Sequence, residues 1–251
     1  NFLKNETIID KIVSSIDPLP QDMIIEIGPG SGALTRKLKN YGCQLIAFEI
    51  DEDTKQYLLT LEDDKTKIIY GDFLESDITK LFKKYDYERL FILGNLPYYI
   101  TTPIIEHIID SKINHESLTI MVQKEVAERF LAKPHHKEYG YMTVLLEYHY
   151  DIEKIIDVDR NEFYPVPKVD STVIKLRKKN SEPVDYEFFK TILKESFQFK
   201  RKTVYNNLKK YDKSILERVL EKHGNKLSDR AEDLPLEAYI DLSKSLNELG
   251  N

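Results

Sequence analysis

Residues 23–35 read M-I-I-E-I-G-P-G-S-G-A-L-T, an apolar run followed by three glycines and a second apolar-containing stretch. The first run predicts a buried strand, and the residues after Gly32 predict a helix that ends near Lys39. Glycines between them let the backbone turn tightly and let a ligand approach, because glycine has no Cβ. This order of strand, glycine turn and helix is typical of nucleotide-binding α/β folds.

The same alternation of strands and helices continues along the chain. Strands are expected at 44–49, 67–70, 90–93 and 118–122, and helices at 5–16, 53–61 and 103–109. Such alternation predicts a Rossmann-like, doubly wound parallel sheet of the α/β class. We expect residues 141–158 and 171–176 to close this sheet as later strands.

The pattern changes after residues 181–183, Ser-Glu-Pro, which read as a linker. Only helical patterns follow, at 185–197, 203–210, 213–223 and 236–247. We therefore expect an α/β domain at 1–180 and a small all-helical domain at 181–251.

The composition bounds the class of protein. Cys43 is the only cysteine of the 251 residues, so neither an intrachain disulfide nor a cysteine zinc cluster is expected, and a reducing compartment, the cytoplasm, is the default. The pair His135-His136 lacks further ligands at metal-binding spacing, so we expect no metal. No apolar run reaches 18 residues and the chain begins without a signal-peptide pattern, so no membrane location is expected.

The charge distribution leaves two interpretations open. The net charge of −6 argues mildly against a nucleic-acid partner. Within Lys194–Lys213, however, seven residues are basic and two are acidic. This run is either a solvated helix face or a phosphate-binding patch, since the latter needs only local positive charge.

Carboxylates follow the expected strands at the positions where a nucleoside is bound. Glu49 ends the second strand, 21 residues after Gly28, and can accept hydrogen bonds from ribose hydroxyls. The glycine loop also fits the dinucleotide pattern G-x-G-x-x-A, so an NAD-dependent dehydrogenase stays open. S-adenosylmethionine has a ribose and no pyrophosphate, and a site rich in acids, here Glu26, Glu49 and Asp72, suits it.

The strand expected at 90–93 is followed by G-N-L-P-Y-Y-I. A turn needs no pair of aromatic rings, but methylation of an adenine amine does need acceptors that orient the amine. The Asn95 amide and the Leu96 carbonyl can accept its two N–H bonds, Pro97 stiffens the turn and Tyr98 offers a face for the base. We interpret Tyr99 as a residue that caps the core.

With these motifs the sequence resembles the small-subunit ribosomal RNA adenine dimethyltransferases of the kasugamycin-sensitivity type, over nearly the whole chain. The matching motifs lie at Asn1–Leu3, Glu26–Gly32, Asn95–Tyr98, Met121–Arg129, Phe163–Ser171 and Phe197–Leu208. The glutamine that precedes Asn1 in the family's Q-N-F-L segment is absent here.

The resemblance implies N6-dimethylation of two adjacent adenosines in the 3′-terminal hairpin loop of small-subunit rRNA, with S-adenosylmethionine as methyl donor, during ribosome biogenesis. The expected cofactor contacts are Asn1, Leu3, Glu26, Gly28, Gly30, Glu49, Asp72 and Asn95. Residues 95–98 form the catalytic turn, and Phe163 is similar to an aromatic that holds the target base. Residues 1–180 would then bind the cofactor and 181–251 the RNA in the nascent subunit. We expect a monomer whose RNA contacts are Lys168, Lys200, Arg201 and Lys202.

Three other functions remain open from the sequence. The nearest is a relative that dimethylates one adenosine of large-subunit rRNA, against which the P-K-V-D-S and R-K-T-x-x-N-N-L segments argue. A noncatalytic RNA-binding or assembly factor would not need the intact turn at 95–98. The dehydrogenase would need a hydride-transfer site, and no later motif resembles one.

Overall fold

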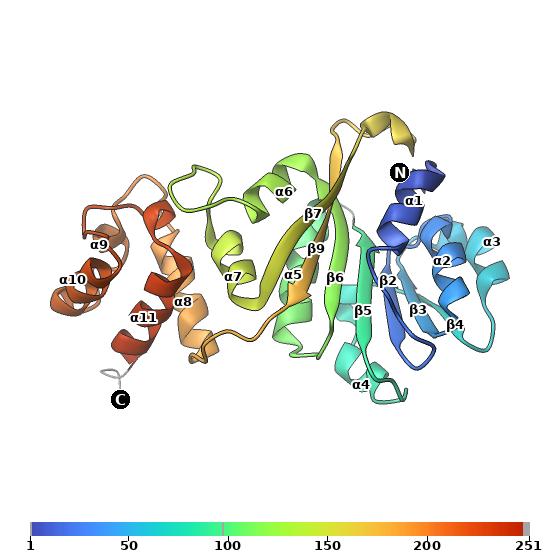
Figure 1. Ribbon diagram of the computed structural model, residues 1–251, viewed down its shortest axis with the longest axis horizontal. Helices are drawn as coiled ribbons and strands as arrows, with labels where there is room; N and C mark the ends of the chain where they lie inside the picture. Colours follow the sequence, from blue (N-terminus) through green and yellow to red (C-terminus); the bar gives the residue numbers. More distant parts are fainter. Residues whose placement is uncertain (1, 97, 248–251) are drawn as a thin grey trace. The chain divides into compact units, whose positions relative to one another are not determined.

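The computed structural model describes residues 2–96 and 98–247. They fall into two compact units, each shown within Figure 1. The first unit contains the residues up to Ala127 together with Asp151–Lys178. The second contains Glu128–Tyr150 and the residues from Lys179 onward.

Seven strands of the described residues form one sheet in the first unit, in the order β4-β3-β2-β5-β6-β9-β7. The strands are β2 (Met23–Ile27), β3 (Gln44–Glu49), β4 (Thr66–Tyr70), β5 (Leu90–Asn95), β6 (Ser117–Gln123), β7 (Tyr150–Val158) and β9 (Ser171–Lys178). Neighbouring strands from β4 to β6 run parallel, and β9 pairs with β6 antiparallel. The doubly wound α/β fold expected from the sequence is thereby confirmed.

Burial on both faces explains the apolar strands. All five residues of β2 are buried, including Glu26, and five of the six residues of β3 are buried. Strands of a parallel sheet that is covered on both faces read as continuous apolar runs. A charged residue inside such a run, like Glu26, therefore needs a separate explanation.

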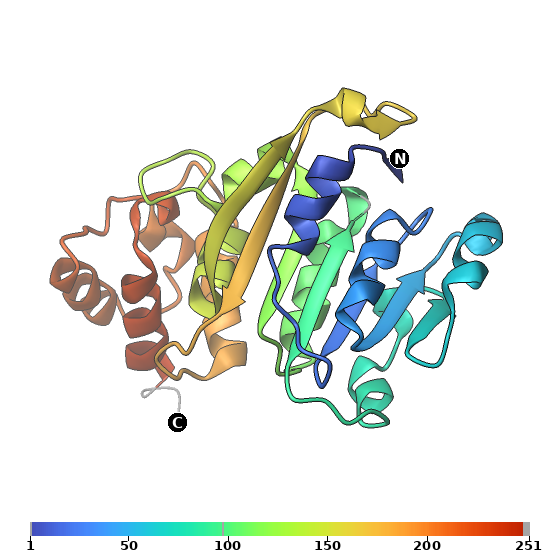
Figure 2. The same cartoon turned by 45° about the vertical axis from the view of Figure 1, so that its right-hand side comes forward.

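Helices cover the two faces of this sheet (Figure 2). Helices α1 (Glu6–Val13) and α2 (Ala33–Leu38) pack over one face, where Ile9, Ile12 and Leu38 join a cluster with strand residues. Helix α5 (Thr101–Asp110) lies on the other face. The smaller elements of this unit are η1 (Lys39–Tyr41), η2 (Glu52–Thr54), α3 (Lys55–Leu58), η3 (Leu59–Leu61), η4 (Phe73–Glu75), α4 (Ile78–Phe82), η5 (Tyr98–Ile100) and η6 (Arg160–Glu162). Helix α6 (Lys124–Phe130) begins in the first unit and continues into the second unit from Glu128.

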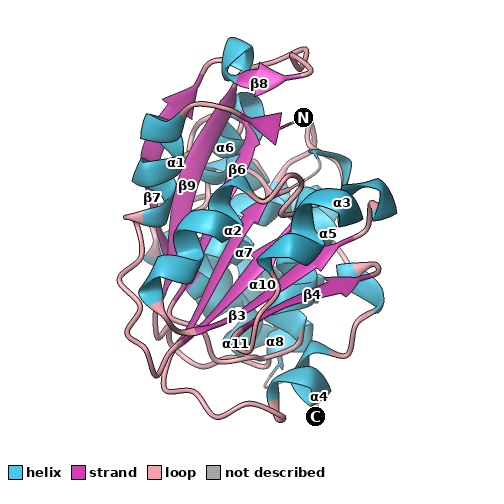
Figure 3. Ribbon diagram, turned by 90° about the vertical axis from the view of Figure 1, so that its right-hand side faces the viewer, coloured by secondary structure: helices cyan, strands magenta, loops and turns pink. Residues whose placement is uncertain are grey.

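A second, two-stranded sheet joins the N-terminal segment to the loop after β7 (Figure 3). Strand β1 (Phe2–Leu3) pairs antiparallel with β8 (Phe163–Tyr164), so that Phe2 faces Tyr164 and Leu3 faces Phe163. The amide of Lys4 extends the pairing by donating to the Glu162 carbonyl at 3.0 Å. These short strands have no hydrophobic pattern of their own, and the sequence did not predict them.

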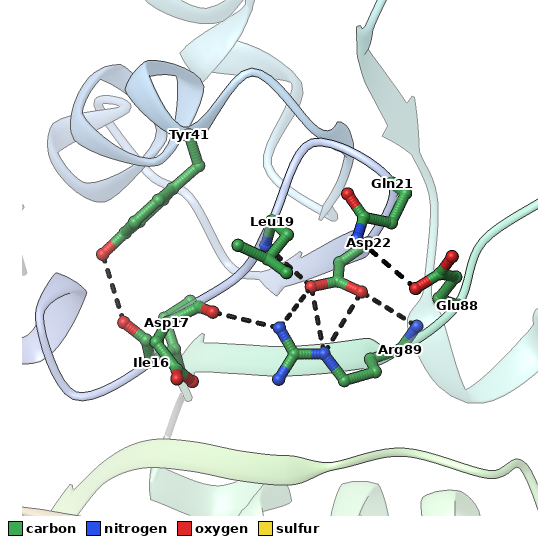
Figure 4. A network of polar contacts seen from close by, with 8 residues as sticks. All are labelled: Ile16, Asp17, Leu19, Gln21, Asp22, Tyr41, Glu88 and Arg89. Atoms are coloured by element: carbon green, nitrogen blue, oxygen red, sulfur yellow. Dashed lines mark hydrogen bonds and ion pairs between the residues drawn. The ribbon is translucent and has the colours of Figure 1, made fainter.

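An ion-pair network joins the amino ends of β2 and β5 (Figure 4). The side chain of Asp22, 1% exposed, accepts from the Arg89 guanidinium at 2.7 Å and from the Leu19 amide at 2.7 Å. The Met23 amide donates to the Arg89 carbonyl at 2.9 Å, which continues the pairing of the two strands. Burial by itself would raise the pKa of the Asp22 carboxyl, but the hydrogen bonds from Arg89 and Leu19 outweigh it and the pKa is lowered.

Residues 141–149 form a helix, α7 (Tyr141–His149), and the expectation of a strand over the whole of 141–158 is wrong for this part. Five consecutive residues, Met142–Leu146, are buried, and such an apolar run does not separate a buried helix from a buried strand. The helix begins after Gly140, whose amide donates to the Thr143 hydroxyl at 3.0 Å. Only β7, from Tyr150, continues as the expected strand.

The second unit contains α7 and the C-terminal helices α8 (Tyr186–Ser196), α9 (Val204–Asn207), α10 (Lys213–Lys222) and α11 (Leu236–Asn247), with η7 (Ala231–Asp233). The four helical patterns after residue 185 are thus confirmed, with α9 shorter than expected. Asp185, Thr203 and Asp212 accept backbone amides at the starts of α8, α9 and α10, as N-caps do.

Candidate active site

The carboxyl ends of β2 and β5 lie side by side where the strand order reverses. Ile27 pairs with Gly94, so the glycine turn after β2 meets the Asn95 end of β5. Ligands of open α/β sheets bind in the crevice at such a switch point. The two motifs that the sequence separates by some 65 residues therefore share one edge of the sheet.

The glycines of the turn leave no space for a side chain. Gly28 has a φ of +73°, and a Cβ on it would lie 3.0 Å from the Asn95 carbonyl oxygen. Gly30 has a φ of +57°, and a Cβ there would lie 3.0 Å from the ring of Phe2. Positive φ is strained for residues with a Cβ, so both the conformation and the packing require glycine.

Glu49 ends β3 beside this turn and is 6% exposed. Its Oε2 accepts from the Gly30 amide at 2.8 Å, and its Oε1 accepts from the Asp51 amide at 2.9 Å. These bonds fix the carboxylate and hold the glycine turn against it. Each carboxylate oxygen can accept more than one hydrogen bond, so the group retains capacity for a ligand hydroxyl.

Glu26 is the charged residue inside β2, and it is 1% exposed. Its Oε2 accepts from the Thr35 hydroxyl of α2 at 2.7 Å, whereas its buried Oε1 has no hydrogen-bond partner among the described residues. The pKa of this carboxyl is raised to about 7, mainly by burial; the Thr35 hydrogen bond opposes the rise and the nearby Glu49 adds to it. A buried polar atom without a partner costs about 1–3 kcal/mol, which a ligand that binds it would offset.

These residues line one cavity of about 430 Å³, a volume within the range of small-molecule sites. Its lining residues are Phe2, Leu3, Glu26, Gly28, Pro29, Gly30, Ser31, Ala33, Leu34, Glu49, Ile50, Asp51, Thr54, Asn95, Leu96, Tyr99, Met121 and Phe163. All of them belong to the first unit. The cavity combines an apolar wall, the carboxyl groups of Glu26, Glu49 and Asp51, and a glycine backbone.

The cavity brings together most of the site residues that the sequence singled out. Leu3, Glu26, Gly28, Gly30, Glu49, Asn95, Leu96 and Phe163 all line it. Asn1, Pro97 and the side chain of Tyr98 lie outside the described part of the chain. Their predicted roles, like the individual roles of the lining residues, stay predictions.

Asp72 is placed differently. Its Oδ1 accepts from the Leu74 amide at 2.9 Å and caps the short helix η4, and Asp72 is not among the described residues that line the cavity. Its predicted contact with an adenine amine therefore remains a prediction.

The interpretation of Tyr99 as a core cap is wrong. Its side chain is 79% exposed and lines the cavity, because the chain turns into η5 directly after the motif. Two further residues that line the cavity, Phe2 and Ile50, were not predicted as site residues from the sequence. Ile50 follows Glu49 in the chain and is 55% exposed. Two adjacent tyrosines after the motif were the available indication for Tyr99, but sequence does not fix the direction in which a turn residue points.

The predicted RNA contacts in the second unit lie on a turn between α8 and α9. Arg201 and Lys202 are exposed, and the Lys202 ammonium lies 4.4 Å from the centre of the Phe199 ring. The Asn207 amide donates to the carbonyls of Ser196 at 2.7 Å and Phe199 at 3.3 Å. These bonds fix the turn that carries the basic side chains.

The remaining basic candidates are also exposed. Lys200 donates to the Lys137 carbonyl at 2.8 Å, within the second unit. Lys168 belongs to the first unit, and its carbonyl accepts from Arg160 at 3.0 Å. The RNA contacts of these four residues stay predictions.

The described residues contain neither a metal-binding cluster nor a membrane-spanning helix. No group of three or more His, Cys, Asp or Glu side chains is arranged to hold a metal ion. No helix within residues 2–96 and 98–247 has the length and apolarity to span a membrane.

Comparison with known proteins places this site in a family. A family model described as ribosomal RNA adenine dimethylase matches residues 1–248. Proteins named ribosomal RNA small subunit methyltransferase A are similar: that of Ligilactobacillus salivarius is 38% identical, covering 100% of this chain and 89% of the relative. The one from Aster yellows witches'-broom phytoplasma is 40% identical, with 97% and 92% covered.

Two solved structures are similar over almost their full lengths. A dimethyladenosine transferase from Plasmodium falciparum has a TM-score of 0.83 and 26% identity, with 100% of this chain and 98% of that chain covered. The 23S rRNA methyltransferase ErmE has a TM-score of 0.74 and 25% identity, with 98% and 100% covered.

The fold is thus that of a Rossmann-like methyltransferase. Within that class the chain belongs to the ribosomal RNA adenine dimethylase family, an enzyme family, which confirms the resemblance found in the sequence. The dehydrogenase alternative finds no support in these relatives.

Proposed function

We propose that this protein transfers methyl groups from S-adenosylmethionine to N6 of two adjacent adenosines in the 3′-terminal hairpin loop of small-subunit rRNA. The observation that carries the proposal is the single cavity that unites Gly28, Glu49, Asn95 and Phe163. Relatives named as small-subunit methyltransferases, at 38% and 40% identity, support the small subunit. The similarity to the 23S rRNA enzyme keeps the large subunit as the alternative to be tested.

The residues of the cavity fit S-adenosylmethionine. The buried Oε1 of Glu26 suits the ammonium of its methionine part, because a cation there would pair with an otherwise unpartnered oxygen. The fixed carboxylate of Glu49 suits the ribose hydroxyls, and the exposed Ile50 next to it offers an apolar surface for the adenine ring. The bound cofactor supplies an electrophilic methyl group on its sulfonium.

The residues after β5 suit the acceptor base. The Asn95 amide oxygen and the Leu96 carbonyl would accept the two N–H bonds of the adenine amine and aim its lone pair at the methyl group. Phe163, 2% exposed and on the wall of the same cavity, would contact the base that enters. This chemistry requires orientation more than a general base, since the proton can leave after the methyl group is transferred.

Exposed basic residues outside the cavity are the proposed contacts to RNA. Lys168, Lys200, Arg201 and Lys202 are exposed cations that suit RNA phosphates. We infer that residues 1–180 bind cofactor and base, that residues 181–251 bind the immature small subunit, and that the enzyme acts as a monomer. Bacterial relatives with rRNA-methyltransferase names support a place in the cytoplasm, where bacterial ribosomes are assembled.

The test is transfer of labelled methyl groups to isolated ribosomal subunits. Small subunits from a strain that lacks these methyl groups should take up label to about four methyl groups each, and large subunits should take up none. Label in large subunits alone would instead support the rival activity. Absence of label in both would support a noncatalytic role.

A further inference from the structure

The segment Tyr164–Val169 exposes apolar side chains beside the candidate active site. Tyr164 is 67% exposed, Val166 54% and Val169 38%. Such a concentration of exposed apolar groups within six residues is uncommon on a protein surface and is typical of an interaction site.

Hydrogen bonds hold this segment at both ends. The Asn5 amide donates to the Glu162 carboxylate at 2.9 Å just before it. At its other end the Arg160 guanidinium donates to the Asp170 carboxylate at 3.1 Å and to the Lys168 carbonyl at 3.0 Å. The exposed side chains therefore stand on an anchored loop, which is the usual construction of a binding loop.

The pairing of β8 with β1 places Tyr164 next to the cavity. Successive residues of a strand point to opposite faces, and Phe163 is buried whereas Tyr164 is exposed. Tyr164 faces Phe2 across the pair, and the Phe2 ring lines the cavity against Gly30. Directly opposed residues have Cβ atoms about 4.5–5.5 Å apart, so Tyr164 is one side chain away from the cavity wall.

Two lysines lie on or beside the segment that carries the Tyr164 ring. The Lys4 ammonium lies 5.4 Å from the centre of the Tyr164 ring, and Lys168 is exposed on the same segment. The carboxylates that precede and follow the segment, Glu162 and Asp170, are hydrogen-bonded to Asn5 and Arg160. An aromatic face flanked by lysines is complementary to a nucleobase with its phosphates.

We propose that Tyr164 stacks on the adenine next to the one in the cavity, with Lys4 and Lys168 at the adjoining phosphates. The inference rests on the proposed function, in which two neighbouring adenosines are modified in turn. When one of them enters the cavity it leaves the RNA stack, and its neighbour loses a stacking partner. The exposed ring of Tyr164 replaces that partner and holds the RNA in position during each transfer.

The test uses small subunits that lack the methyl groups and four proteins: the wild type, Tyr164→Ala, Tyr164→Phe and Tyr57→Ala. Tyr57, 45% exposed on α3 and absent from the described cavity lining, is the matched surface control. Tyr164→Ala should raise KM roughly 5- to 20-fold, the lower part of the range for one stacked base, with kcat within about twofold. Tyr164→Phe keeps the ring and should behave as wild type, as should Tyr57→Ala.

A fluorescence measurement separates stacking from other contacts. In subunits whose terminal hairpin carries 2-aminopurine at one of the two positions, the probe has no C6 amine and cannot be the acceptor, so the remaining adenosine takes the cavity. Binding of the wild type and of Tyr164→Phe should leave the probe quenched, because the ring replaces the lost stacking partner, and binding of Tyr164→Ala should raise its fluorescence.

The outcomes are distinguishable. An unchanged KM and unchanged quenching in Tyr164→Ala, with the wild type fully active, would overturn the inference and leave the proposed function standing. A raised KM with unchanged quenching would also overturn it, because Tyr164 would then contact a ribosomal protein or a phosphate. A wild type that labels no small-subunit adenine would remove the proposed function and this inference with it.

Discussion

At the scale of single residues, Glu26 carries the most specific chemical consequence. Its carboxyl has a pKa of about 7, raised by burial, so it is largely protonated below that pH in the protein without ligand. An ammonium group that binds at Oε1 favours the ionised form. Cofactor binding and ionisation of Glu26 are therefore linked.

We predict that the affinity for S-adenosylmethionine rises as the pH is raised from 5.5 towards 7, by up to about tenfold per pH unit at the acid end, and levels off before the cofactor's own ammonium loses its proton near pH 8. In Glu26→Gln, which keeps the volume and leaves an acceptor for Thr35, the affinity should be roughly tenfold lower at pH 7.5 and nearly independent of pH. Calorimetric titration of both proteins measures this. Equal slopes for the two proteins would show that Glu26 does not face the ammonium.

Some of the site residues could be predicted from the sequence and others could not. Glu26, Glu49 and Asn95 follow from chemistry, because each stands at the end of, or within, a strand whose position the apolar pattern fixes. Tyr99 and Phe2 do not follow, because their contribution depends on how a short helix and a two-residue strand turn their side chains. For Asp72, after the third strand, the sequence allows either a contact with an adenine amine or a helix N-cap, and the structure shows the cap on η4.

At the scale of elements, the Asp22–Arg89 network aligns β2 with β5 at the edge opposite the cavity. The Asp22 side chain is fully buried and that of Arg89 is 33% exposed. Because the strands are joined along their length, a fixed register at this edge also sets Gly28 against Asn95 at the other.

We predict that Arg89→Ala lowers the free energy of unfolding by about 3 kcal/mol, because it leaves a buried carboxylate without its cation. Lys154→Ala, which removes an exposed pair with Asp157, should cost less than about 1 kcal/mol. Urea unfolding at neutral pH measures both. A loss for Arg89→Ala no larger than that of the control would contradict this role.

The pH dependence of that loss has a defined sign. The pKa of Asp22 in the folded protein lies below its ordinary value of 3.8, so its contribution is fully present above pH 3.8 and disappears as the pH falls through the folded pKa. In Arg89→Ala the guanidinium no longer offsets the burial of Asp22, so the carboxyl takes up a proton at a higher pH than in the wild type. The difference in stability between the two proteins should therefore be largest near neutral pH and shrink as the pH falls into the acid range. A difference that already vanishes near pH 6 would point to another group.

Element assignment from the sequence succeeded where periodicity and turn residues agreed. The glycine turn after β2 and the capping residues at the starts of α8, α9 and α10 are examples. It failed at residues 141–149, because an uninterrupted apolar run fits a buried helix and a buried strand equally well.

At the scale of the whole molecule, one acidic chain has two proposed functions: residues 1–180 bind the cofactor and the base, and residues 181–251 bind the small subunit. The net charge is −6, yet RNA must be bound, so local cations have to supply the attraction. The exposed turn with Arg201 and Lys202, fixed by the Asn207 amide, is the strongest candidate in the second unit.

We predict that the double variant Arg201→Glu/Lys202→Glu binds small subunits more weakly and with a shallower salt dependence, the slope of log Kd against log salt falling by about 1.4 to 1.8. The charge-matched control is Lys83→Glu/Lys84→Glu in the first unit, on exposed residues after α4. Cofactor affinity should stay unchanged in both variants. If the two variants weaken binding equally, net charge and not this turn determines the affinity.

The central claim, a methyltransferase that modifies two neighbouring adenines, is tested most directly by mass mapping of small-subunit rRNA after reaction with S-adenosylmethionine. The wild type should produce two adjacent N6,N6-dimethyladenosines in the 3′-terminal hairpin, and Asn95→Ala, which removes an acceptor without removing core volume, should produce neither. Methyl groups at other positions, or dimethylation by Asn95→Ala at near-normal rate, would contradict the account.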